Sequence, residues 1–207
     1  MRARVVTPFF PYGTQILLIS HSLFWLATNL VSPFLSIFFI TEMTDVTVSE
    51  VGIASLIFYL SFGVLGPVMG FISDRIDGLK DELVFVIFGY IARGVLFMLF
   101  ALASNAWHLY MFQFFLGAFR AVAGPADKVL YSKYLEGRQS ATMWGIDESL
   151  INIFAALGAG VGGYLVSIYG FRYVFVLTGA VTIVAGLVNF PLLNGMRQRA
   201  KKRVRIK

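Results

Sequence analysis

The residues in this sequence that could do chemistry are polar side chains set within long apolar stretches. The first stretch contains a histidine followed, at helical spacing, by an aromatic and two small polar residues: His21, Trp25, Thr28 and Asn29. On a helix these side chains share one face, so they form a polar stripe that should avoid lipid and face water or a substrate. His21 is then either a ligand or proton carrier, or a hydrogen-bonded packing residue.

Charged residues inside apolar stretches are the second chemical signal, because an unpaired charge in lipid is costly. Arg93 and Arg120 each lie near the middle of such a stretch. We expect Arg120 to line a cavity or to form a structural ion pair, whereas the role of Arg93 stays open. Asp147 and Glu148 begin a later stretch. They either bind and release a coupled proton or lie at headgroup level near a helix N-terminus, where negative charge is favoured.

Catalytic and metal chemistry have little support in the sequence. The chain has no cysteine, so disulfide and thiolate chemistry are excluded. Its two histidines, His21 and His108, are far apart and belong to no metal-ligand spacing. No G-x-S-G nucleophile motif is present for an intramembrane protease. We therefore expect neither an enzyme nor a bound cofactor or metal.

The elements that must position these residues are membrane-spanning helices. The 207 residues are 58% hydrophobic and only 14% charged, with a mean hydropathy of +0.78, which does not suit a water-soluble surface. A span needs about 20 apolar residues, and only closed hydrogen-bonded helices suit such stretches in lipid. Six stretches qualify, approximately Gln15 to Ile40, Val51 to Ser73, Leu83 to Ala103, Leu109 to Tyr131, Ala141 to Ile168 and Tyr173 to Leu193.

The predicted fold class is therefore an all-α integral membrane bundle of six helices. Residues 1–14 are predicted to be a cytoplasmic lead-in, 15–193 the bundle and 194–207 a basic cytoplasmic tail. Positive residues gather in alternate connectors and in the tail, which predicts that both termini are cytoplasmic. We expect the protein to lie in the plasma or inner membrane of the cell. Seven of the 17 Lys and Arg follow residue 195, and such a tail faces anionic lipid rather than nucleic acid.

Two of the predicted spans carry glycines on one helix face. Gly63, Gly66 and Gly70 lie in the second span, and Gly158 and Gly162 lie one turn apart in the fifth. Small residues at this spacing let two helix backbones approach closely in a membrane. The glycines either pack helices within one subunit or form a subunit interface.

Several segments resemble the conserved patterns of one transporter family, in the same order along the chain. The segment GFISDRIDGLK resembles the loop between the second and third helices of the major facilitator superfamily, G-x-x-x-D-R-x-G-R-K, with Gly70, Asp74 and Arg75 in register. FRAVAGPADK is similar to the family's fourth-helix pattern R-x-x-x-G, which places Arg120. The segments around Arg138 and GFRYVF resemble the starts of the fifth and sixth helices.

The resemblance implies roles for particular residues. It implies a gating and loop network of Asp74, Arg75, Asp127 and Arg138, in which Asp127 neutralises Arg75. It also implies a central cavity lined by the first and fourth helices, hence by the stripe that begins at His21 and by Arg120. The fifth-span glycines lack the proline of the antiporter pattern, so antiport does not follow.

Transporters of this family have two six-helix halves with the substrate between them, and this chain matches one half. We expect a homodimer that transports a small molecule by alternating access, with the second helix of each copy against the fifth of the other. The alternative is a non-transporting membrane subunit, or a truncated half that needs a different partner. Paired copies of Arg120 would suit an anionic substrate, whereas the 21 Phe and 9 Tyr would equally suit an amphipathic drug-like compound.

Overall fold

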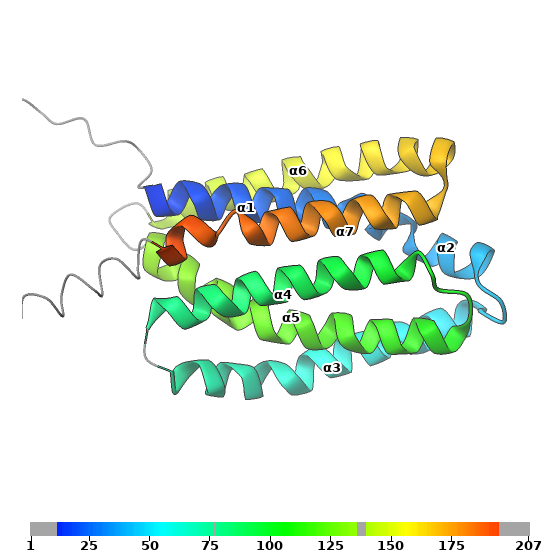
Figure 1. Ribbon diagram of the computed structural model, residues 1–207, viewed down its shortest axis with the longest axis horizontal. Helices are drawn as coiled ribbons and strands as arrows, with labels where there is room; N and C mark the ends of the chain where they lie inside the picture. Colours follow the sequence, from blue (N-terminus) through cyan, green and yellow to red (C-terminus); the bar gives the residue numbers. More distant parts are fainter. Residues whose placement is uncertain (1–11, 77, 136–139, 195–207) are drawn as a thin grey trace, which may run out of the picture.

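The computed structural model describes residues 12–76, 78–135 and 140–194. Helices α1 and α3 to α7 lie lengthwise in one bundle, and the short α2 lies at one end of it (Figure 1). Their bounds are α1 Tyr12–Asn29, the 3₁₀ turn η1 Ser32–Phe34, α2 Leu35–Glu42, α3 Val48–Asp74, α4 Leu79–Phe100, α5 Ala106–Leu135, α6 Ser140–Tyr169 and α7 Phe171–Leu187. The predicted all-α class is confirmed. Most of the predicted lead-in and all but Asn194 of the predicted tail lie outside the described residues.

The first predicted span is one helix in the sequence analysis and is broken in the structure. α1 ends at Asn29, and the chain passes through η1 before α2 begins. Pro33 lies in this turn; it has no N–H to donate and its ring crowds the preceding turn of a helix. Phe34 N donates instead to Val31 O at 2.9 Å, a tighter three-residue closure. The break interrupts the helix but does not end the span, because the membrane-crossing segment still runs over Tyr12–Glu42.

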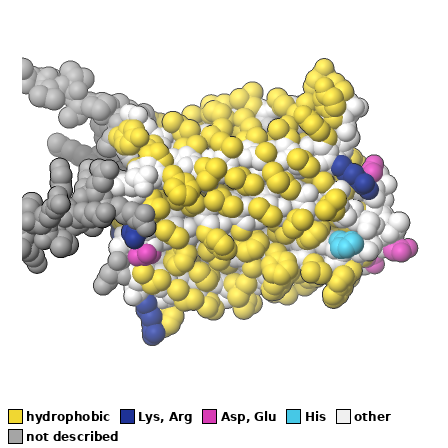
Figure 2. Space-filling model, in the orientation of Figure 1, with side chains coloured by type: hydrophobic (Ala, Val, Ile, Leu, Met, Phe, Trp, Pro, Cys, Tyr) yellow, Lys and Arg dark blue, Asp and Glu magenta, His cyan; other side chains and the backbone are white. Residues whose placement is uncertain are grey.

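Among the described residues, five helical segments are long and apolar enough to cross a membrane: Tyr12–Glu42, Val48–Asp74, Leu79–Phe100, Ala141–Tyr169 and Phe171–Asn194. The predicted fourth span falls in α5, which has 30 residues and is therefore long enough, but it is less apolar because it carries Arg120, Asp127 and Lys128. The side of the molecule seen in Figure 2 is a broad apolar band with charged side chains gathered at its two ends.

The helices pack as a series of neighbours whose two ends do not close on each other. α3 packs on α5, α5 on α4, α4 on α7, α7 on α1, and α1 on α6. Stacked rings fill one part of the core, with Phe100 and Phe175 centred 5.5 Å apart. α3 and α6 are the ends of the series and leave the space between them for a polar pocket. The start of α1 and Asn194 lie at the same end of the bundle (Figure 1), as an even number of spans requires.

The two glycine groups of the sequence have different surroundings. A Cβ atom on Gly158 would lie 2.3 Å from Leu26 O, and one on Gly162 would lie 2.0 Å from Leu30 O. These glycines therefore let α6 approach α1 within the same chain, which is the packing alternative of the sequence analysis. A Cβ atom on Gly63 or Gly70 would meet nothing within 4 Å, so this face of α3 has no such neighbour.

Candidate functional site

A pocket of about 610 Å³ lies among five helices. It reaches from the middle of the bundle toward the end where α3 finishes and α6 begins. Its walls are made by residues of α1, α3, α4, α5 and α6: His21, Phe24, Trp25, Phe62, Gly63, Gly66, Pro67, Tyr90, Arg93, Arg120, Ala123, Gly124, Pro125, Asp127, Lys128, Tyr131, Trp144, Asp147, Glu148 and Ile151. The volume is sufficient for a small organic solute.

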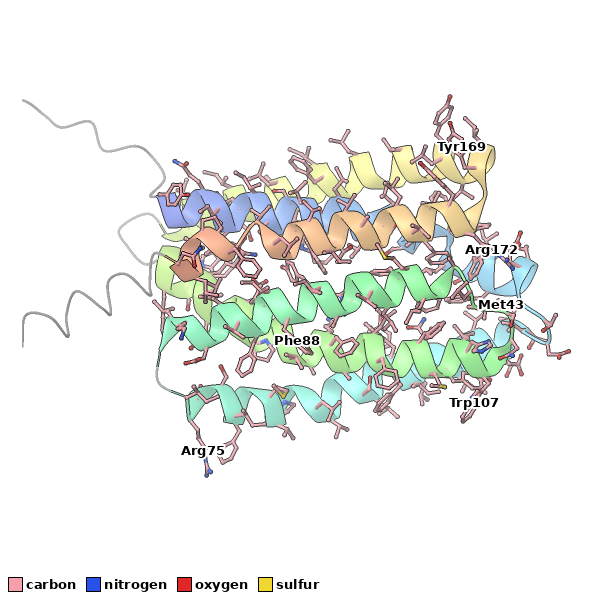
Figure 3. The ribbon with its side chains drawn as sticks, viewed as in Figure 1. Met43, Arg75, Phe88, Trp107, Tyr169 and Arg172 are labelled. Atoms are coloured by element: carbon pink, nitrogen blue, oxygen red, sulfur yellow. The ribbon has the colours of Figure 1, made fainter. Side chains whose placement is uncertain are left out.

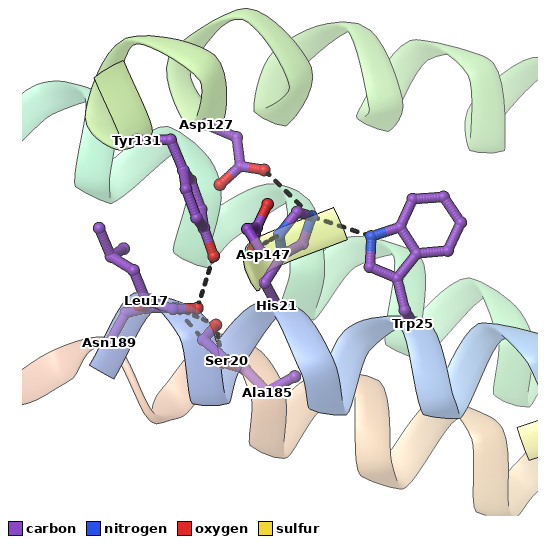
Figure 4. Close-up of polar contacts among 9 residues, drawn as sticks. All are labelled: Leu17, Ser20, His21, Trp25, Asp127, Tyr131, Asp147, Ala185 and Asn189. Atoms are coloured by element: carbon purple, nitrogen blue, oxygen red, sulfur yellow. Dashed lines mark hydrogen bonds and ion pairs between the residues drawn. The ribbon is translucent and has the colours of Figure 1, made fainter. Parts of the chain in front are cut away.

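His21 is the centre of a polar cluster in this pocket (Figure 4). Its Nδ1 atom lies 3.1 Å from Asp147 Oδ1, and its Nε2 atom accepts a hydrogen bond of 2.9 Å from Trp25 Nε1. Asp127 Oδ2 is 3.8 Å from the same Nε2. The cluster joins three helices, because His21 and Trp25 come from α1, Asp127 from α5 and Asp147 from α6.

The hydrogen bonds of His21 define its tautomer. An indole nitrogen can only donate, so Nε2 must accept the bond from Trp25 and Nδ1 carries the hydrogen that is donated to Asp147. This is a neutral imidazole between two carboxyl groups. A second proton on the ring would occupy Nε2, displace the bond from Trp25 and turn an N–H toward Asp127. The arrangement can thus take up and release one proton with a change of hydrogen-bond partners.

Several buried contacts hold α1 in place around His21. Tyr131 OH donates to Leu17 O at 2.8 Å, and its ring centre is 4.9 Å from that of His21. Ser20 Oγ donates to Ala185 O at 2.8 Å and accepts from Asn189 Nδ2 at 2.6 Å. α1 is therefore tied to α5 through Tyr131 and to α7 through the serine.

Two arginines occupy another part of the pocket and each lies over an aromatic ring. The Cζ atom of Arg93 is 4.5 Å from the centre of the Phe24 ring. The Cζ atom of Arg120 is 4.5 Å from the centre of the Phe62 ring. The prediction that Arg120 lines a cavity agrees with its place in the pocket wall, and the structure adds Arg93, whose role the sequence left open.

The predicted polar stripe of α1 is divided by the structure. His21 and Trp25 line the pocket, as does Glu148 beside Asp147. Thr28 Oγ1 instead donates to Phe24 O at 3.0 Å, and Asn29 Nδ2 donates to Trp25 O at 2.8 Å. These two side chains bond to carbonyls of their own helix and do not belong to the pocket wall.

The predicted loop network is brought together only in part. Arg75 is exposed at the end of α3, points away from the bundle (Figure 3), and its Cζ atom lies 4.2 Å from the centre of the Phe71 ring. Within the described residues no ion pair of 4 Å or less joins Arg75 to Asp127, which lies beside His21 instead. Asp74 is exposed at the same helix end. Arg138 lies outside the described residues.

Apart from Trp25, the aromatic residues of the pocket wall were not singled out by the sequence analysis. Tyr90 and Trp144 line the pocket, and the Tyr90 ring stacks on Phe24 with centres 4.2 Å apart. Helical spacing offered a signal, because Tyr90 is three residues before Arg93 and shares its helix face. Trp144 lies three residues before Asp147 in the same way. With so many aromatic residues in the chain, this signal alone selects no particular ring.

Comparisons with known proteins agree with this geometry. The family model of the Major Facilitator Superfamily matches residues 17–206. The chain belongs to the major facilitator superfamily. Its length and six-helix architecture are consistent with one half of the fold of that family.

Proteins similar to this chain differ in the functions that their names describe. The chain is 25% identical over 142 residues to the membrane sensor protein UhpC of Salmonella typhimurium, covering 69% of this chain and 31% of that protein. It is 30% identical over 166 residues to the multidrug resistance protein MdtG of Proteus mirabilis, covering 75% and 38%. It is 29% identical over 140 residues to the uncharacterized MFS-type transporter YqjV of Bacillus subtilis, covering 67% and 33%. The chain thus spans about a third of the length of these relatives.

Proposed function

We propose that this chain is a half-size secondary transporter that works as a homodimer and moves a small solute across the cell membrane by alternating access. The observation that supports the proposal most directly is the pocket, which contains titratable and cationic side chains in the membrane-spanning part of the bundle. Polar groups at this depth are costly and mark substrate or ion pathways. Their placement on α1, α4, α5 and α6 gives a solute contacts with most of the bundle.

A second bundle is needed to complete the transport pathway. α3 and α6, the two ends of the helix series, flank the pocket, and a single bundle offers no partner against which to rock. In transporters of this kind two repeats lie on either side of a central site. We infer that a second copy of the chain supplies the opposite wall.

The proposed contact places α3 of each copy against α6 of the other. A Cβ atom on Gly63 or Gly70 would meet nothing within 4 Å, and one on Gly66 would meet only the Phe62 side chain of α3 itself, at 3.9 Å. On α6 the available surface is an apolar stripe of exposed residues at helical spacing: Ile153, Leu157, Val161, Tyr164 and Ile168. Gly158 and Gly162 face α1 and are not part of the contact that we propose.

We further propose that the cluster of His21, Asp127 and Asp147 couples a proton to transport. The neutral imidazole can accept a proton at Nε2 when its bond to Trp25 opens. Because the cluster joins α1, α5 and α6, a change of partners at His21 alters contacts between helices that line the pocket. The proposed orientation has both chain ends in the cytoplasm, which is the side favoured by the Lys and Arg of the connectors.

Two measurements test the proposal. Purified protein in liposomes should exchange a solute selected from a compound library, and a proton gradient should change the rate of exchange. For the dimer, cysteines are placed at Gly63 and Ile153 of this cysteine-free chain. These positions lie 11 residues from the end of α3 and 13 from the start of α6, so they are at similar depths of about 16 and 20 Å.

Oxidation should join two copies through these cysteines and yield a covalent dimer. A control pair at Gly63 and Val184 uses an exposed position on α7, away from the proposed contact, and should give no dimer. Disulfides within one chain only, or equal yields from both pairs, would contradict the proposed interface.

A non-transporting role is the second candidate function. It is favoured by the likeness to UhpC, which is described as a membrane sensor protein. A sensor or assembly subunit would bind a solute without moving it, or would need a different polypeptide as partner. Solute binding by the purified chain with no flux in liposomes would support this alternative.

A further inference from the structure

We propose that Arg93 and Arg120 form an anion-binding site in the pocket, and that the substrate is an organic anion with an apolar or aromatic body. The inference rests on the proposed transport function, for which it names the class of substrate. It is carried by the surroundings of two guanidinium groups that sequence patterns did not link.

The flat face of the Arg93 guanidinium packs on an aromatic ring, and its buried Nε donor has no partner in the described structure. The guanidinium lies over Phe24, whose ring is in turn stacked on Tyr90. Its Nε atom is buried and has no hydrogen-bond partner. A guanidinium has five N–H donors in its plane, and stacking on a ring leaves these edges free. A buried donor without a partner costs free energy, which a bound acceptor would recover.

Arg120, on the neighbouring helix, is more exposed than Arg93 but also lies over aromatic rings. Its guanidinium lies over Phe62 and, at 5.7 Å, near Phe58. Arg93 and Arg120 line the same pocket, and their like charges repel each other. An anion bound between the two guanidinium groups would be attracted to both and would offset their mutual repulsion. Each guanidinium can donate two parallel hydrogen bonds to a carboxylate or phosphate.

The acidic residues of the pocket do not neutralise these arginines. Asp147 and Asp127 are next to His21, and no ion pair within 4 Å connects an arginine to an acid in the described part of the pocket. Along α5, Arg120 and Asp127 are seven residues apart, or about 10 Å. Lys128 and Glu148 lie toward the acidic end of the pocket. The pocket is therefore divided into a proton-binding part and a cationic part.

The other residues of the pocket wall indicate the chemical nature of the uncharged part of the anion. Trp25, Phe62, Tyr90 and Trp144 surround the arginines and the His21 cluster. The wall combines these aromatic side chains with charged groups, and such a wall favours a solute that has an apolar or aromatic body and a charged group.

The test uses three probes of nearly the same shape and different charge: 2-naphthoate, 2-naphthamide and 2-naphthamidine. Binding to the full chain is measured by calorimetry in nanodiscs of phosphatidylcholine, so that no anionic lipid competes. We expect naphthoate to bind at least about tenfold more tightly than the amide, as a charge-assisted pair of hydrogen bonds predicts. The amidine should bind more weakly than both.

Arg93→Gln and Arg120→Gln should each lower naphthoate affinity at least about tenfold and leave naphthamide affinity unchanged, which also shows that the pocket is still folded. Arg172→Gln is the matched control, because Arg172 lies at the opposite end of the bundle (Figure 3) and should have no effect. Preference for the amidine, or equal loss of all three probes in the pocket variants, would overturn the anion site.

Measuring binding and flux separately distinguishes a failure of this inference from a failure of the proposed function. Flux of neutral or cationic solutes together with no binding of naphthoate would refute the anion site and leave transport standing. Charge-selective naphthoate binding that depends on both arginines, with no flux of any solute, would refute transport and leave the anion site standing.

Discussion

The Nδ1 atom of His21 lies 3.1 Å from Oδ1 of Asp147, which joins the middle of α1 to the first part of α6. α6 is an end of the helix series and the proposed contact with a second copy, so this bond connects the pocket to the surface that would move. The other groups that face His21 are Glu148 of α6 and Asp127 and Tyr131 of α5. A change in the charge of the imidazole would therefore alter its electrostatic interactions with both α5 and α6.

We predict that His21→Gln abolishes the dependence of solute flux on a proton gradient. Glutamine keeps one donor and one acceptor but cannot gain a proton between about pH 5 and pH 8, where histidine titrates. Flux should fall to the rate seen without a gradient, measured in liposomes with defined internal and external pH. His108→Gln is the control, since His108 contacts Ser104 at the other end of the bundle. Full stimulation by the gradient in the His21 variant would show that the proton is carried elsewhere.

We predict that an added methyl group at the α1–α6 crossing destabilises the bundle. Gly158→Ala places a Cβ atom against Leu26 O of α1, and Gly162→Ala places one against Leu30 O just after α1. Backbone atoms cannot yield as a flexible side chain would. A loss of about 1 to 3 kcal/mol is expected from such overpacking. It should appear as a lower melting temperature of the protein in detergent.

The matched control for the crossing is Gly160→Ala in the same helix. A Cβ atom there meets nothing within 4 Å, and alanine is a better helix former than glycine by about 0.5 to 1 kcal/mol. Its melting temperature should stay the same or rise. A fall as large as that of the Gly158 variant would mean that close approach to α1 is not the cause.

The sequence predicted the helices well because lipid imposes a strong requirement. A segment that crosses the membrane needs both length and apolar composition, and those can be counted without knowing what packs on what. The break at Pro33 was missed because proline is tolerated inside other helices of this chain, as Pro67 in α3 and Pro125 in α5 show. Whether a proline interrupts a helix depends on which neighbours satisfy the freed backbone groups.

The site was less predictable, since its members come from five helices. The face shared by His21 and Trp25 was predicted from spacing along one helix, whereas a cavity position for Arg120 was one of two alternatives for a charge within a span. The partner of Asp127 was assigned to Arg75 by family resemblance, whereas the packing places it near His21. Helix spacing specifies which residues share a face and says nothing about the rotation of that face toward a neighbour. For the same reason Thr28 and Asn29 could not be told apart from the pocket residues.

We predict that Ser20→Ala weakens the junction of α1 and α7. Ser20 Oγ links Ala185 O to Asn189 Nδ2 in the buried part of the bundle, so its loss leaves the asparagine amide poorly satisfied. The expected cost is about 1 to 2 kcal/mol, measured as reduced resistance to thermal unfolding. Ser132→Ala serves as the comparison, because the Ser132 hydroxyl is exposed and bonds to Val129 O of its own helix turn. Equal effects of the two substitutions would argue against a special role of the buried serine.

Because Trp25 donates a hydrogen bond to His21, we predict that Trp25 fluorescence reports the protonation of His21. Trp107 and Trp144 are replaced by Phe, so that Trp25 is the remaining tryptophan of the three in the chain. As the pH is lowered and Nε2 becomes protonated, the indole N–H loses its acceptor and turns to water in the pocket. Emission of Trp25 should therefore shift to longer wavelength with a single titration, and His21→Gln should remove that titration. An emission spectrum that stays constant between about pH 5 and pH 8, or a titration that survives in the His21→Gln variant, would contradict the exchange of partners at this imidazole.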